Sequence, residues 1–298
     1  MLAAMVATSA NAAAVLAPDD DEELIPSGKG WGQRATPGHA NNKARPGING
    51  ITYHGGPLML GTTNTYFIWY GEWRGNTATS ILSDLASSIG DSSYFNINTT
   101  YYNGNNTHVS NSVHYAGATA DNYSRGTALS DAGVQGIVSD AITSARLPKD
   151  TNGVYFVLTS ADVNETSGFC TQYCGWHTHG TIGGSDIKYA FIGNPDRCPS
   201  ACSAQFPNSP NGNAGADGMA SIIAHELEEA VTDPDLNAWY DQRGQENADK
   251  CAWTFGATYS TANGALANMK LGSRDFLIQR NWVNASAGYC AVSFGFVP

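Results

Sequence analysis

The sequence predicts a mixed α/β (α+β) fold, in which a mixed β-sheet packs with helices and disulfides staple the loops. Runs of β-branched and aromatic residues alternate with runs of helical periodicity, an order that favours helices packed on a sheet. Six cysteines, an even number, occur with paired spacing. With 298 residues, of which 42% are hydrophobic, the chain can bury a sizeable core.

The composition changes near residue 50. Residues 1–50 contain an alanine-rich run, the acidic run "DDDEE" and a stretch rich in Gly, Pro and Asn, which is typical of a signal-like or propeptide-like arm. Residues 51–298 are expected to form a single globular domain. A neighbouring subunit is one candidate for what holds such an arm, which gives the hypothesis of a homo-oligomer assembled through it.

Five elements of the domain can be placed by their patterns. "TNTYFIWYG" (63–71) is a buried-strand pattern closed by Gly, and the following segment (76–89) has apolar residues at helical spacing. A second amphipathic helix (134–147) leads into a strand (153–160), and "KYAFIGN" (188–194) is a further strand. The cysteine-rich insertions then fall in loops between the sheet and the helix that follows.

The cysteines predict covalent crosslinks. Their even number and paired spacing predict three disulfides, but six cysteines allow fifteen pairings, so the connectivity stays open. The alternative is a zinc cluster, although zinc knuckles use tighter Cys-x-x-Cys pairs. The residues concerned are Cys170, Cys174, Cys198, Cys202, Cys251 and Cys290.

Several features indicate a secreted, extracellular protein. Disulfides form in oxidising compartments. No stretch after the N-terminal run approaches the roughly 20 apolar residues of a membrane span. The net charge of −11, with only 15 Lys and Arg, argues against a nucleic-acid partner and suits solubility or cation binding. Five sequons would carry N-linked glycans on the secretory route: Asn98, Asn105, Asn122, Asn164 and Asn284.

The stretch "ADGMASIIAHELEEAVTDP" predicts a helix, with Asp217 as the N-cap signal and Pro234 as the stop. At about 100° per residue, His225 and Glu229 lie on one side, at the rim of the apolar stripe. Glu226 projects into the middle of that stripe. An ionised carboxylate there needs a proton, a hydrogen bond or a nearby cation.

Three interpretations of this helix follow. In the first, its polar side chains form a buried hydrogen-bond network that only holds the helix in place. In the second, His225, Glu229 and Asp235 are metal ligands, at the offsets of the zincin motif His-Glu-x-x-His-x-x-Gly-x-x-His, and Glu226 is the general base. In the third, a metal is bound without catalysis, and the carboxylates favour calcium or manganese over zinc.

Two further motifs could add to such a site. His177 and His179 in "CGWHTHG" would point to one side on a strand, and His177 would then supply a metal-binding imidazole. The alternative is a pair of loop histidines near a disulfide. Glu246 and Asp249 in "ENADKC" are either partners that support the ligands or solvated charges.

Several separate motifs occur in a fixed order: "YHGGPLMLGTTNTYFIWYGEW", "VYFVLTSADVNETSGFCTQYCGWH", "KYAFIGNPDRCPSAC", "DGMASIIAHELEEAVTDPDLNAWYD" and "ENADKC". Together they resemble the EXORDIUM, or phosphate-induced protein, family from about residue 51 to the C-terminus. The resemblance implies a secreted protein of the cell wall or extracellular matrix, with wall or matrix components as partners and no established reaction. The family helix usually reads His-Glu-x-x-Glu and then Thr-Asn-Pro, whereas this chain has Asp233 for that Asn and adds Asp235.

The sequence therefore leads to one main hypothesis and two alternatives. The main hypothesis is a secreted EXORDIUM-like protein of the cell surface or matrix with a zincin-like site for zinc, calcium or manganese. The first alternative is a zinc-dependent extracellular peptidase. The second is a structural protein that self-assembles through its N-terminal arm.

Overall fold

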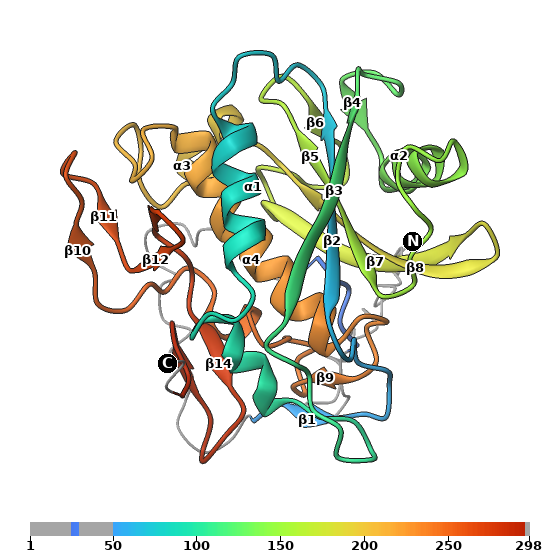
Figure 1. Ribbon diagram of the computed structural model, residues 1–298, viewed down its shortest axis with the longest axis vertical. Helices are drawn as coiled ribbons and strands as arrows, with labels where there is room; N and C mark the ends of the chain where they lie inside the picture. The colour runs from blue at the N-terminus through green and yellow to red at the C-terminus, as the bar shows by residue number, and fades with distance from the viewer. Residues whose placement is uncertain (1–24, 30–49, 296–298) are drawn as a thin grey trace, which may run out of the picture.

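A five-stranded mixed β-sheet lies at the centre of the computed structural model, which describes residues 25–29 and 50–295 (Figure 1). The strand order is β3-β2-β5-β8-β7, in which β3, β2, β5 and β8 are parallel and β7 pairs antiparallel with β8 at one edge. The bounds are β2 (Thr63–Tyr70), β3 (Val113–Asp121), β5 (Gly153–Thr159), β7 (Gly175–Ile182) and β8 (Ser185–Ile192).

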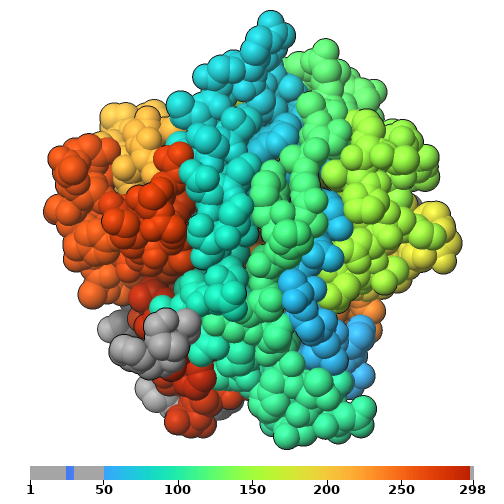
Figure 2. Space-filling model, viewed as in Figure 1, coloured from blue at the N-terminus to red at the C-terminus, as the bar shows by residue number. Residues whose placement is uncertain are grey.

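Helices cover both faces of this sheet. Helices α1 (Ala78–Ser88) and α4 (Ala214–Thr232) pack together on one face, and α2 (Asp131–Thr143) lies on the other (Figure 1). The space-filling view shows α1 at the surface of the first face, between the C-terminal segments and β3 (Figure 2). The mixed α/β prediction is therefore confirmed, with α4 enclosed inside the molecule.

Short elements complete the described chain. Near the sheet these are β1 (Thr52–Tyr53), η1 (Phe95–Thr100), β4 (Ala128–Leu129), β6 (Asn164–Glu165), η2 (Pro195–Arg197), α3 (Pro199–Cys202), β9 (Trp239–Tyr240) and η3 (Asp249–Cys251). The C-terminal part consists of three hairpins, made of β10 (Tyr259–Ser260), β11 (Leu266–Ala267), β12 (Met269–Leu271), β13 (Arg274–Phe276), β14 (Asn281–Val283) and β15 (Tyr289–Ala291).

Helix α4 departs from the predicted amphipathic helix because it is buried on nearly every side. It contacts α1, η1 and η2 as well as the strands β5, β7 and β8. Its N-cap is Asn213, whose Oδ1 accepts a hydrogen bond from Ala216 N at 3.0 Å, so the prediction of Asp217 as N-cap was wrong. Asp217 instead lies in the first turn, where it accepts hydrogen bonds from Asn211. The helix ends at Thr232, ahead of Pro234 as predicted.

Three disulfides staple the structure, as predicted. Two of them tie the segment before β7 to the η2–α3 segment, and the third ties η3 to β15. The pairs are Cys170–Cys198, Cys174–Cys202 and Cys251–Cys290. In the described part of the chain, no helix combines the length and the apolar character that a membrane crossing requires.

One of the five predicted glycosylation sites is blocked in the folded chain. Asn98 is fully buried, its Nδ2 donates to Phe95 O at 3.1 Å, and its Oδ1 lies 3.4 Å from the side-chain nitrogens of Asn247 and Asn281. A glycan on Nδ2 would have to displace this core, so the prediction for Asn98 is corrected. The other sequons are exposed at Asn105 and Asn122 and half-buried at Asn164 and Asn284.

A short part of the predicted N-terminal arm packs on the sheet edge. Gly28 O accepts a hydrogen bond from His177 N at 3.1 Å, and Lys29 Nζ lies 2.5 Å from Asp131 Oδ2. A Cβ at Gly28 would lie 2.0 Å from His177 O, so only glycine permits this approach. Residues 25–29 therefore cover the open edge of β7, while the predictions for the rest of the arm lie outside the described residues.

Candidate metal centre

Helix α4 and strand β7 come unusually close where β7 begins. A side chain at Gly175 would collide with Ile222 of α4, since a Cβ there would lie 2.5 Å from Ile222 Cγ2. The missing side chain lets the strand rest on the helix. Two residues further on, His177 points at the face of α4 that carries His225 and Glu229. The strand interpretation of "CGWHTHG" is thus the one that the structure supports, and the loop interpretation was wrong.

The first group of ligand-type side chains contains His225, Glu229 and Asp249. Within one helical turn of α4, His225 Nε2 lies 3.0 Å from Glu229 Oε1. Asp249 at the start of η3 adds its Oδ1 at 3.5 Å from the same nitrogen, and its backbone N donates to Glu229 Oε1 at 3.1 Å. All three side chains are buried, and their ligand atoms lie within 4.8 Å of one another.

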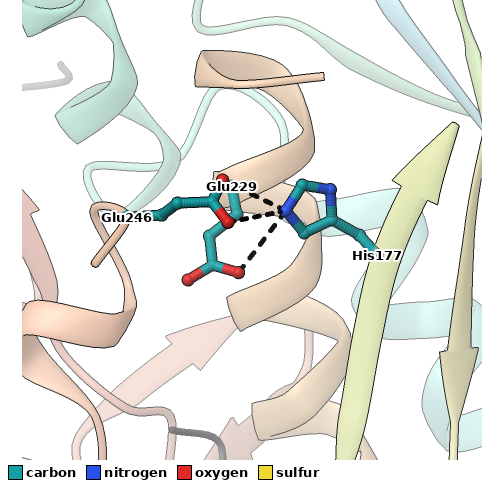
Figure 3. Close-up of side chains that lie close together, drawn as sticks. All are labelled: His177, Glu229 and Glu246. Atoms are coloured by element: carbon teal, nitrogen blue, oxygen red, sulfur yellow. Dashed lines mark hydrogen bonds and ion pairs between the residues drawn. The ribbon is translucent and has the colours of Figure 1, made fainter. Parts of the chain in front are cut away.

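The second group contains His177, Glu229 and Glu246, and Figure 3 shows the imidazole pointing from β7 toward both carboxylates. His177 Nε2 lies 3.1 Å and 3.2 Å from the two oxygens of Glu246 and 3.7 Å from Glu229 Oε2. The two groups therefore share Glu229, and together they form a five-residue cluster that we call the buried centre: His177, His225, Glu229, Glu246 and Asp249.

Glu226 adds a further carboxylate beside the buried centre. Its side chain is 2% exposed and lies against β7, because a Cβ at Gly175 would be 3.1 Å from Glu226 Oε1. Within the described residues, Glu226 Oε2 has no hydrogen-bond partner. Such an atom is costly to bury unless a proton or a cation compensates it.

Burial dominates the protonation of these groups. It raises the pKa of Glu226 and of Glu246 well above the usual carboxyl range, and nearby carboxylates add to the rise. Burial lowers the pKa of His177 to about 4, which keeps its imidazole neutral. Burial also opposes the charged form of His225, but Glu229 and Asp249 outweigh it and raise the pKa of His225 well above its ordinary value.

The family is decided by comparison with known proteins. The conserved region of phosphate-induced protein 1 matches residues 51–279 of this chain. The chain belongs to the phosphate-induced protein 1 family. The predicted resemblance to EXORDIUM and phosphate-induced proteins is therefore confirmed.

Three plant proteins are similar to this chain over most of its length. The chain is 33% identical to protein EXORDIUM-like 5 of Arabidopsis thaliana over 273 residues, which are 78% of this chain and 75% of that protein. It is 30% identical to protein EXORDIUM-like 3 of the same plant over 279 residues, 80% and 82% of the two chains. Protein PHOSPHATE-INDUCED 1 of Nicotiana tabacum is 28% identical over 221 residues, 64% and 67% of the two chains. No solved structure matches this chain.

Asp235 lies apart from the other predicted ligands. Asp233 Oδ1 accepts hydrogen bonds from Asn237 N and Ala238 N, both at 2.6 Å, and this turn directs the chain after α4 toward β9. Asp235 consequently lies 2.8 Å from Lys188 Nζ and 3.6 Å from His179 Nδ1, in a separate and partly exposed group.

Asp249 lies beside His225 and Glu229, where the zincin spacing predicted Asp235, and Glu246 lies beside His177. The sequence signal for them was the pair of carboxylates in "ENADKC", just ahead of the disulfide-bonded Cys251. The sequence did not show that the Glu229 carboxylate lies close to both His225 and His177. The structure thus brings two imidazole nitrogens and three carboxylates together in one buried volume, a set of groups that could hold zinc or manganese.

Proposed function

We propose that this member of the phosphate-induced protein 1 family is a secreted metalloprotein that binds a divalent cation in its buried centre. The observation that carries the proposal is an excess of buried carboxylates. Glu226, Glu229, Glu246 and Asp249 are at most 5% exposed, and in the described chain no lysine or arginine pairs with them. A divalent cation is the simplest group that balances them.

Energetics favour a bound cation over a purely structural network. An ionised carboxylate buried without a partner costs several kcal/mol, so without a cation the raised pKa values of Glu226 and Glu246 leave these groups protonated, whereas a cation lets them ionise as ligands. The ligand-type atoms are also spaced for coordination. Nitrogen–oxygen separations of 3.0 to 3.7 Å lie close to the ~3.4 Å expected between neighbouring ligands at about 2.1 Å from a tetrahedral zinc.

Metal analysis of the full-length chain, purified without chelators, tests this function. We expect at least one equivalent of zinc, manganese or calcium per chain, and a content below about a tenth of an equivalent would contradict the proposal. Glu229→Gln should lose the metal because Glu229 belongs to both groups. His179→Ala is the matched control, since this imidazole lies two residues along β7 but outside the buried centre, and it should keep the metal.

The proposed location is extracellular. Three disulfides and the paired cysteine spacing support an oxidising compartment. Wall or matrix components remain the expected partners. Self-assembly through residues 1–50 also stays a prediction, and a chain that lacks these residues should sediment as a smaller species if it is right.

A second candidate function is metal-dependent hydrolysis, as in a peptidase, with α4 as a zincin-like helix. The observation that favours it is the buried, unpartnered oxygen of Glu226, one residue from His225. In this role Glu226 would take the proton from an attacking water, and the cation would polarise the substrate carbonyl. Glu226→Gln should then abolish hydrolysis of an unfolded protein while the metal content stays unchanged. Activity that survives this change would reject the mechanism.

A further inference from the structure

The buried centre has two halves of equal composition. One half pairs His225 with Asp249, and the other pairs His177 with Glu246. The halves come from different elements, because His225 and Asp249 belong to α4 and η3, while His177 belongs to β7 and Glu246 precedes η3. Each half therefore offers one imidazole and one carboxylate of its own, and Glu229 is the residue that both contain.

Glu229 directs one oxygen to each half. Its Oε1 lies 3.0 Å from His225 Nε2, and its Oε2 lies 3.7 Å from His177 Nε2 (Figure 3 shows the His177 side). A carboxylate that gives one oxygen to each of two cations is a common bridge in two-metal sites, where the cations lie roughly 3.5 to 4 Å apart. The ligand atoms of each half lie within 4.8 Å of one another, close enough to surround one cation.

The charges of the buried residues match two cations better than one. Four carboxylates, those of Glu226, Glu229, Glu246 and Asp249, surround two imidazoles. With the imidazoles neutral and acting as ligands, two divalent cations balance all four carboxylates in their ionised form, whereas one cation leaves two of the carboxyls to be neutralised by protons.

Unpartnered atoms supply a second, independent observation. Among the described residues, Asp249 Oδ1 and Glu226 Oε2 have no hydrogen-bond partner, although both side chains are about 98% buried. Asp249 Oδ1 faces His225 Nε2 across 3.5 Å, a separation that suits a shared cation. Buried polar atoms are rarely left without a partner, so an orphaned oxygen at this place points to a ligand.

We propose that the buried centre holds two divalent cations, one between His225 and Asp249 and one between His177 and Glu246, bridged by Glu229. The proposal rests on the proposed function, because it presumes that the centre binds metal. It adds the stoichiometry and assigns each imidazole to its own cation.

The deciding experiment measures how many zinc ions bind. The full-length chain is stripped of metal, dialysed against a zinc series and analysed for zinc per chain. We expect a plateau at two equivalents. A plateau at one overturns the two-cation proposal and leaves the proposed function standing, and a plateau at zero overturns both.

Variants assign the two cations to their halves. His177→Ala and His225→Ala should each bind one equivalent, and Glu229→Gln should lose most binding at both places. His179→Ala, on the same strand, should bind two and serves as the control. If His177→Ala and His225→Ala each still bind two equivalents, the assignment is wrong.

A spectroscopic test avoids substitutions that could impair folding. The unmodified chain is loaded with manganese to saturation and its electron paramagnetic resonance spectrum is recorded. Two manganese ions bridged by Glu229 should give a spin-coupled spectrum at saturation. A spectrum of isolated manganese ions at every loading would overturn the bridge.

Discussion

Two imidazole–carboxylate groups lie next to each other on strand β7, and they differ in what neutralises them. The buried centre contains His177, and among the described residues no lysine or arginine forms an ion pair with its carboxylates. The second group contains His179, Asp186 and Asp235, and Lys188 forms ion pairs with both of these carboxylates. The second group is also partly exposed, whereas the first is closed from solvent.

This difference separates a group whose charges are balanced by a lysine of the same chain from one that, under the proposed function, binds a cation from outside. Lys188 already supplies a positive charge to the second group, and solvent screens what remains. In the buried centre solvent does not screen the charges, and among the described residues only imidazoles, without lysine or arginine, face the carboxylates, so these depend largely on protons or on metal. Proximity of histidine and acid alone therefore does not identify a metal site. The proposal of a metal site in the buried centre rests instead on burial and on the absence of lysine and arginine around it among the described residues.

Metal removal should produce the largest contrast between the two groups. A ligand at about a thousand times its Kd stabilises the folded state by about 4 kcal/mol, so removing even one cation should lower Tm by about 10 °C. Calorimetry with and without a chelator, followed by metal addition, measures this. The Asp235→Asn variant should respond to the chelator like the unmodified chain, because Asp235 lies in the other group. An unchanged Tm in the chelator would contradict the idea that a bound cation stabilises the buried centre.

The disulfide at η3 should matter next, because it anchors one half of the buried centre. Cys251 ends η3, which carries Asp249, and the Cys251–Cys290 crosslink spans 39 residues. Replacing both cysteines with Ala should cost about 4 kcal/mol of unfolding free energy and should weaken metal affinity.

A matched control is available for that change. The Cys170–Cys198 crosslink spans 28 residues, and its removal should cost a similar amount, about 3.5 kcal/mol, while affinity stays the same. The start of β7 is still held by Cys174–Cys202 in that variant. Denaturant unfolding and metal titration measure the two effects. Equal affinity losses in both double variants would show that η3 has no special role.

Local sequence patterns predicted most of the fold but only part of the buried centre. Buried strands such as β5 and amphipathic helices such as α1 can be predicted from the spacing of their apolar residues. Strand β7 was harder to predict as a strand because "GWHTHGTI" is rich in Gly, His and Thr, and its polar side chains belong to the site. Strand β3, with "VHYAGATAD", is an edge strand of mixed burial and gave a similarly weak signal.

Within the buried centre, sequence reasoning could predict the relative positions of only those residues that lie on helix α4. The contact of His225 with Glu229 follows from helical geometry. Beyond Thr232, position depends on the turn at Asp233, whose hydrogen bonds send Asp235 to Lys188 and let the chain return with Glu246 and Asp249. A spacing rule taken from zincin motifs cannot anticipate that turn, because tertiary contacts rather than helical periodicity determine it.

Replacing Lys188 tests whether the presence of a lysine explains why the second group is not expected to bind a cation. Lys188→Met should cost roughly 1 to 3 kcal/mol, because Lys188 is buried and loses its pair with Asp235, while its other partner, Asp186, is partly exposed and screened. It should also create a weak additional cation site at His179, seen as extra zinc bound only at high concentration. Lys188→Arg keeps the charge and should bind no extra zinc. If both variants bind the same number of ions, the missing basic residue does not explain the difference.

The smallest effect is expected at Glu228, a buried carboxylate on α4 that lies outside the buried centre. Asn281 Nδ2 donates to Glu228 Oε2 and Asn247 Nδ2 donates to Glu228 O, so amides surround this residue where imidazoles surround Glu229. Glu228→Gln keeps the shape and an accepting oxygen, so unfolding free energy should change by less than about 1 kcal/mol. Metal content should stay the same, in contrast to the loss expected for Glu229→Gln one residue away. A metal loss in Glu228→Gln would mean that burial of any acid on α4 suffices, and that the imidazoles do not define the centre.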